Sequence, residues 1–82
     1  SDPMQSFFER RAPRLDTTLP GVRHIQDLVR AHTPVTLRLV DGTTLEGTIR
    51  WQDPEVLAVE TEAGSPLVLV SRQGLLTLRA LA

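Results

Sequence analysis

From residue 35 onward, hydrophobic and polar residues alternate along the chain, which is the pattern of β-strands with one buried face. Two such stretches, residues 35–40 and 43–53, are joined by Asp41 and Gly42. This pair fits a two-residue hairpin turn of the primed type, because both residues tolerate a positive φ. The expected inward positions are Val35, Leu37, Leu39, Leu45, Gly47, Ile49 and Trp51, and the expected outward positions include Arg50 and Gln52.

Three further strands are expected within residues 56–61, 67–72 and 75–81. Five short strands with tight connections predict a single antiparallel meander. A sheet of this size can enclose a core only if it bends strongly, and Gly47 faces inward where the bend crowds the backbone. The third and fourth strands are apolar on both faces, which indicates that both faces are covered.

A helix is predicted before these strands, because apolar residues recur there at spacings of three and four. Thr17 or Thr18 is expected to cap this helix, Pro20 suits its first turn, and Pro34 ends it. Its apolar stripe comprises Val22, Ile25, Leu28, Val29 and His32. We therefore expect a loosely ordered arm over residues 1–16, of which residues 1–3 are a cloning remnant before Met4, and one domain over residues 17–82.

Composition narrows the classes of function. The chain of 82 residues has no cysteine, which excludes disulfides and thiolate zinc sites, and its net charge of −1 gives no basic signal for nucleic acid. Its two histidines are eight residues apart, and no known catalytic or phosphate-binding motif is present. We therefore expect a protein that is not an enzyme and has no metal or cofactor. The absence of a long apolar run or a secretory signal predicts a cytoplasmic location without membrane insertion.

The apolar strands near the C-terminus predict self-association. A domain of this size buries only about 60% of its unfolded surface, and a subunit interface is a common remedy for a small core. The fourth and fifth strands would expose long apolar edges, which pairing between subunits removes if it repeats head to tail until it closes. A cyclic homo-oligomer is therefore predicted. Its expected interface residues are Val68, Val70, Leu76 and Leu78.

The motif "LVDGTTLEGTIRWQD", followed by "VSRQGLLTL", resembles the Sm-like family and within it the Hfq branch of bacterial RNA chaperones. Gly42, Gly47 and Asp53 carry the structural motif, and the resemblance extends over residues 19–81. The runs "LDTTLPGVRHIQDLV" and "WQDP" are most similar to the divergent cyanobacterial members. The resemblance implies a mainly β fold, in which an N-terminal helix precedes a strongly bent five-stranded antiparallel sheet. It also implies a six-membered ring, closed by pairing of the fourth and fifth strands between neighbours.

The resemblance further implies three surfaces that contact RNA. On the helix side, around the pore, family members bind U-rich ends. The corresponding positions here are Gly21, Glu55, Arg72 and Gln73. Glu55 replaces an aromatic residue, and a base–aromatic stack contributes about 1–3 kcal/mol, so we expect weakened binding on this face.

The opposite face of the ring, which reads A-rich RNA in the family, corresponds here to Arg38, Gly42, Leu45 and Glu46. The favoured interpretation is that Arg38 and Glu46 pair across the strands, and such a face could equally receive a protein tail. At the rim, the corresponding residues are Gln26 and Arg30, and the basic arm over residues 10–14 could compensate for missing rim arginines.

Two functions follow from the resemblance. The first is an RNA-binding ring in post-transcriptional regulation, with weakened contacts to A-rich or U-rich single strands. The second is a protein-docking scaffold with little RNA binding, for example for a type IV pilus motor protein, with which the cyanobacterial branch is associated. An Sm-like subunit of another assembly is a third, less specific interpretation.

Overall fold

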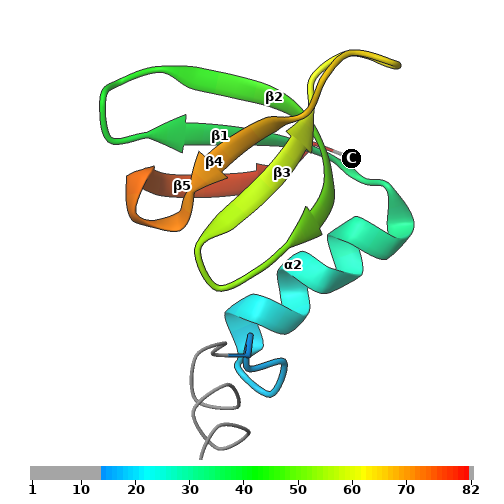
Figure 1. Cartoon of the computed structure of the whole chain (residues 1–82), viewed down its shortest axis with the longest axis vertical. Helices are drawn as coiled ribbons and strands as arrows, with labels where there is room; N and C mark the ends of the chain where they lie inside the picture. The colour runs from blue at the N-terminus through cyan, green and yellow to red at the C-terminus, as the bar shows by residue number, and fades with distance from the viewer. Residues whose placement is uncertain (1–13, 82) are drawn as a thin grey trace, which may run out of the picture.

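The computed structural model describes residues 14–81, and these form one helix followed by a five-stranded antiparallel sheet (Figure 1). The predicted fold class is confirmed. The basic positions Arg10 and Arg11, and the expected cloning remnant, lie outside the described residues. The elements are helix α2 (Pro20–Ala31), strands β1 (Pro34–Leu39), β2 (Thr44–Gln52), β3 (Val56–Glu60) and β4 (Val68–Ser71), a 3₁₀ turn η1 (Arg72–Gly74), and strand β5 (Leu75–Ala80).

The strand order is β4-β3-β2-β1-β5, so the expectation of a simple meander holds for four strands and is wrong for the fifth. After β4, η1 redirects the chain and β5 pairs with β1 instead of returning along β4. The connection from β4 to β5 is short because the sheet curls and brings the edge of β1 that pairs with β5 close to the end of β4 (Figure 1). A hydrogen bond from the Val40 N–H to the Gly74 carbonyl, 2.8 Å long, closes this corner. Strands β4 and β5 are consequently the two edges of the sheet.

Gly47 of β2 lies close against the end of β3. A Cβ atom built at this position would overlap the carbonyl oxygen of Glu60 and would lie 3.0 Å from Val59 Cγ1. No side chain fits there without moving backbone. The predicted reason for a glycine in the middle of the strand, a crowded backbone at this point of the bent sheet, is confirmed, and the crowding comes from the backbone of β3.

A β-bulge at Arg50 changes which residues of β2 face the core. Ile49 pairs with Val59 and Trp51 pairs with Ala58, so Arg50 is the extra residue. Because side chains alternate with a period of two, one extra residue turns the rest of the strand over. The expected inward position of Trp51 and outward position of Gln52 are therefore wrong. The Trp51 side chain is 42% exposed, whereas Gln52 is half-buried and reaches the helix.

The hairpin between β1 and β2 has a loop of three residues, not the expected two. The N–H of Leu39 donates to the Thr43 carbonyl (2.9 Å) and the N–H of Gly42 donates to the Leu39 carbonyl (3.0 Å). Within this loop only Gly42 has a positive φ, of 90°, which is the geometry of a turn closed by a glycine bulge. The Asp41 carboxylate accepts from the Thr43 N–H and hydroxyl, and these bonds lower the pKa of Asp41.

Helix α2 covers one open end of the curved sheet, and the β1–β2 hairpin projects away from it (Figure 1). Neither Thr17 nor Thr18 caps it, because Leu19 occupies the cap position without a side-chain bond. The helix ends at Ala31, since His32 adopts a left-handed φ of 53°, and exposed His32 leaves the expected apolar stripe. The core comprises Leu28, Val35, Leu37, Ile49, Leu57, Val59 and Val70.

Candidate nucleic-acid interface

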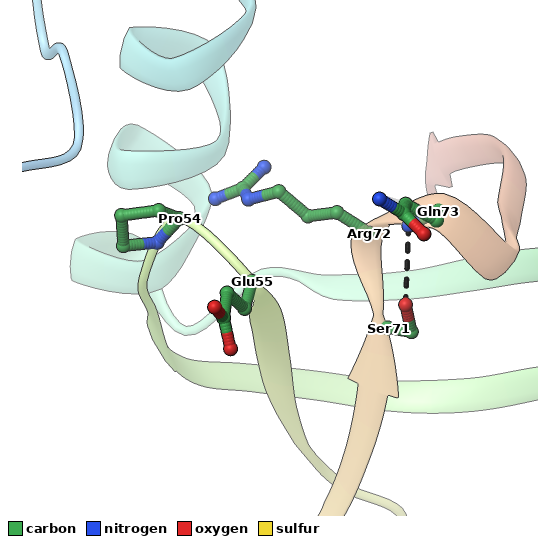
Figure 2. A pocket seen from close by; sticks show the side chains of 5 residues that line it. All are labelled: Pro54, Glu55, Ser71, Arg72 and Gln73. Carbon is green, nitrogen blue, oxygen red and sulfur yellow. Dashed lines mark hydrogen bonds between the residues drawn. The ribbon is translucent and has the colours of Figure 1, made fainter. Parts of the chain in front are cut away.

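A hollow of about 230 Å³ lies between the start of β3 and η1 (Figure 2). It contains three of the four residues predicted for the helix-side face, and Gly21, which is exposed on the helix, is not among its lining residues. The Ser71 hydroxyl accepts a 3.2 Å hydrogen bond from the Gln73 N–H, which fixes the backbone of η1. The lining residues are Pro54, Glu55, Ser71, Arg72 and Gln73.

The Arg72 side chain extends from η1 toward Pro54 and helix α2 (Figure 2). Its Nε donates to the Asp53 carbonyl (2.8 Å) and its Nη2 donates to Gln52 Oε1 (2.6 Å). The Gln52 amide in turn donates to Gln26 Oε1 (3.1 Å) on the helix. Arg72 is half-buried and holds η1, β2 and α2 together, so only part of its guanidinium remains for an external phosphate.

Asp53 shapes the mouth of the same hollow. Its Oδ1 accepts 2.8 Å hydrogen bonds from the N–H groups of Val56 and Glu55. These two bonds, and to a smaller extent the positive charge of Arg72, lower the pKa of the Asp53 carboxyl. The carboxylate therefore fixes the turn that presents Glu55 to solvent. Gly42, Gly47 and Asp53, the three positions of the sequence motif, all have structural roles.

A second groove, of about 520 Å³, lies on the sheet face that points away from the core, over β1, β2 and β5. Of the four residues predicted for this face, only Arg38 lines the groove. Leu45 is half-buried and packs against the core. The lining residues are Thr36, Arg38, Thr44, Thr77, Leu78 and Arg79.

The expected ion pair between Arg38 and Glu46 does not form. The register places Arg38 opposite Thr44 and Glu46 opposite Thr36, so the two charged residues are diagonal neighbours. Within residues 14–81 the one ion pair joins Arg50 Nη1 to Glu60 Oε1 at 3.0 Å.

Four residues that line the groove were missed by the reasoning from sequence, namely Thr36, Thr44, Thr77 and Arg79. Thr77 and Arg79 were the harder two to find. They belong to β5, which enters this face only because β5 pairs with β1. Alternation along residues 75–80 would have identified them if that pairing had been known.

The rim residues predicted from the resemblance lie together on helix α2. Gln26 and Arg30 line one hollow of about 280 Å³ with Thr17, Arg23 and Asp27. The Asp27 carboxylate offsets part of the positive charge, and Gln26 Oε1 already accepts from Gln52. This surface is therefore less cationic than its arginines suggest.

The four expected interface residues divide into two kinds. Val68 and Leu76 are 40% and 60% exposed, on the two edge strands. Val70 is 5% exposed and belongs to the core of the single chain, against which the half-buried Leu78 packs. The first two therefore offer a partner the larger apolar surface.

Within residues 14–81, no group of three or more side chains is arranged to hold a metal ion. No helix in this part of the chain has the length and apolar character needed to cross a membrane.

Comparison with known proteins is informative at the level of family and fold. A family model described as "Hfq related" matches residues 19–80. An Hfq protein from Anabaena sp. is 27% identical with a TM-score of 0.68, and the alignment covers 76% of this chain and 97% of that one. A crystal structure described as the pleiotropic translational regulator Hfq is 19% identical with a TM-score of 0.65, covering 71% and 93%. No curated protein matches the sequence.

Proposed function

Because the chain belongs to the Hfq-related family, we propose that it assembles into a homohexameric ring that binds single-stranded RNA and acts in post-transcriptional regulation. The match over residues 19–80 carries this proposal, because it includes both edge strands, the whole lining of the helix-side hollow and of the groove, and all of the rim lining except Thr17. The likeness to a protein described as a translational regulator supports the regulatory role.

The edge strands support the ring. Strand β4 and strand β5 each have one neighbour in the sheet, so each leaves one edge of backbone N–H and carbonyl groups for another strand. Pairing of β4 with β5 of the next subunit is head to tail, and such contacts close into a ring when the rotation per subunit allows it. The exposed side chains of Val68 and Leu76 would be covered at this interface.

The helix-side hollow supports weakened RNA contacts on that face. Glu55 places a carboxylate at its opening, where it repels phosphate, and no aromatic side chain lines the hollow. Two nitrogen atoms of Arg72 already donate within the protein. We therefore expect U-rich RNA to bind this face weakly.

Sedimentation and RNA titration together test the proposal. Sedimentation equilibrium at micromolar concentration should give about six times the 9.1 kDa chain mass. Labelled A-rich and U-rich oligonucleotides should bind more weakly as salt increases, with a log–log slope of about −0.7 for each phosphate contact on single strands. Leu76→Lys, which buries a charge at the proposed interface, should dissociate the ring and remove most RNA affinity. If neither oligonucleotide binds at micromolar protein in low salt, the RNA-binding proposal must be abandoned.

A protein-docking scaffold, such as one for a type IV pilus motor protein, is a second candidate function. It is favoured by an apolar row that crosses three strands, in which Trp51 pairs with Ala58 and Ala58 with Leu69. The outer two side chains are 42% and 57% exposed. Replacing Trp51 and Leu69 by Gln should abolish binding of a purified motor protein and leave RNA affinity unchanged. Equal binding by wild type and variant would exclude this row as the docking surface.

A further inference from the structure

The groove over β1, β2 and β5 contains two arginines whose sequence positions are far apart. Arg38 of β1 lies opposite Thr77 of β5, and Arg79 of β5 lies opposite Thr36 of β1. The two arginines are thus diagonal neighbours across one strand pair, a relation in which residues lie about 7–8 Å apart. Both are exposed, and both line the same groove. Long flexible side chains at this separation can converge on one anion or bind two adjacent ones.

Apart from Leu78, the rest of the lining matches a phosphate better than a base. Three threonines supply hydroxyl groups, which commonly donate to phosphate oxygens in nucleic-acid complexes. The planar guanidinium fork binds two phosphate oxygens at once. No carboxylate and no aromatic ring lines this groove. Glu46, on β2, lies opposite Thr36 and diagonal to Arg38, and it offsets part of the positive charge. It forms no ion pair with either arginine, since the one ion pair within residues 14–81 is between Arg50 and Glu60, so both guanidinium groups keep their donors for a ligand.

We propose that this groove binds the sugar–phosphate backbone of single-stranded RNA without selecting the base, through Arg38 and Arg79. The proposal rests on the proposed RNA-binding function and specifies which part of the RNA this face takes. The threonine hydroxyls complete the contacts to the phosphate oxygens. Base identity has little effect because the groove offers no stacking platform, which is the usual source of base contact on single-strand-binding surfaces.

The test compares matched charge variants of the assembled ring. Arg38→Gln and Arg79→Gln each remove one positive charge from the groove, and Arg50→Gln removes one from the bulge of β2, outside the groove, as the control. Affinity for labelled oligo-A, oligo-U and oligo-C of equal length is measured at several salt concentrations. Sedimentation of each variant verifies that assembly is unchanged, which matters for Arg79 because it lies on an edge strand.

We expect both groove variants to bind each oligonucleotide about tenfold more weakly than wild type, the effect of one lost charged hydrogen bond. The slope against salt should become shallower by at least about 0.7, one phosphate contact. Arg50→Gln should change affinity less than threefold, and wild type should bind the three oligonucleotides within about threefold of one another.

Several outcomes would overturn the inference. Retention of wild-type affinity and slope by both groove variants would remove the site while leaving the RNA-binding function intact. A more than tenfold preference of wild type for one base that the groove variants abolish would show that the groove reads bases. Displacement of RNA by polyglutamate as readily as by unlabelled RNA would make the groove a site for an acidic protein segment instead. Failure of wild type to bind any oligonucleotide is a different result, because it would remove the proposed function itself.

Discussion

Replacing Gly47 by alanine should destabilise the protein far more than the addition of one methyl group suggests. The new Cβ atom would overlap the Glu60 carbonyl oxygen and would lie 3.0 Å from both the Glu60 carbonyl carbon and Val59 Cγ1. A flexible side chain could move aside, but the main obstacle is the backbone of β3. The strands must therefore separate or the bend in β2 must open.

The cost can be bounded from the packing. Overpacking a tight core typically costs about 1–3 kcal/mol, and contact with backbone places Gly47→Ala at or above the upper end. A chain of 82 residues has a total stability of about 4–12 kcal/mol, at about 0.05–0.15 kcal/mol per residue. A loss of about 3 kcal/mol should lower the melting temperature by about 12–24 °C, using the size scaling for small domains.

Gly21→Ala is the matched control, because it makes the same chemical change in open space. A Cβ at Gly21 meets nothing within 4 Å, and the residue lies in helix α2. Alanine there should stabilise the protein by about 0.4–1 kcal/mol through its higher helix propensity and the lower entropy of the unfolded chain. Urea denaturation followed by circular dichroism, at one fixed protein concentration, measures both variants, since assembly makes apparent stability depend on concentration. If Gly47→Ala unfolds within 0.5 kcal/mol of wild type, the close approach of the two backbones is not a constraint on this fold.

Three further predictions concern the turn, the helix link and the edges. Folding lowers the pKa of Asp53 from 3.8, so in acid the unfolded chain binds more protons than the folded chain. The contribution of Asp53 to the unfolding free energy should therefore be complete above pH 3.8 and should be lost as the pH falls through the folded-state pKa. In urea titrations, the difference in unfolding free energy between pH 7 and pH 3 should be smaller for Asp53→Asn than for wild type. Arg72→Ala should lower the unfolding free energy by about 1–3 kcal/mol, because Gln52 Oε1 and the Asp53 carbonyl lose a charged donor, and an unchanged urea midpoint would contradict this. Leu76→Lys should give a folded monomer by sedimentation and circular dichroism, whereas Val70→Lys should unfold the chain, because Val70 is 5% exposed. If the two variants behave alike, the distinction between an interface residue and a core residue is wrong.

The period of the sequence was sufficient to predict the elements and the role of Gly47, because each depends on residues close together in the chain. The bulge at Arg50 was not predictable in this way. Nothing in the local pattern of β2 marks the extra residue, and its consequence, exposed Trp51 and inward Gln52, depends on the pairing with β3. The apolar character and alternating position of Trp51 indicated that it faces the core, but the register with β3 turns it to the outside.

The candidate surfaces also have some features that the sequence predicted and others that depend on long-range pairing. The resemblance brought Glu55, Arg72 and Gln73 together correctly, because they flank one turn and one strand end. It did not reveal that Arg72 is held by Gln52, which requires the bulge. The spacing of the strands likewise did not predict that β5 pairs with β1, and it therefore did not predict that Arg79 lies beside Arg38. Long-range pairing, rather than local preference, sets these contacts.

The location of β4 and β5 at opposite edges of one sheet has a genetic consequence for the proposed ring. A subunit with one damaged edge still offers the other, so it can join a growing arc of normal subunits and stop its extension. Such a variant would have a dominant-negative effect, because it would block ring closure by wild-type subunits when the two are produced together. Damage to the core, by contrast, would remove the subunit from the pool and behave as a recessive loss.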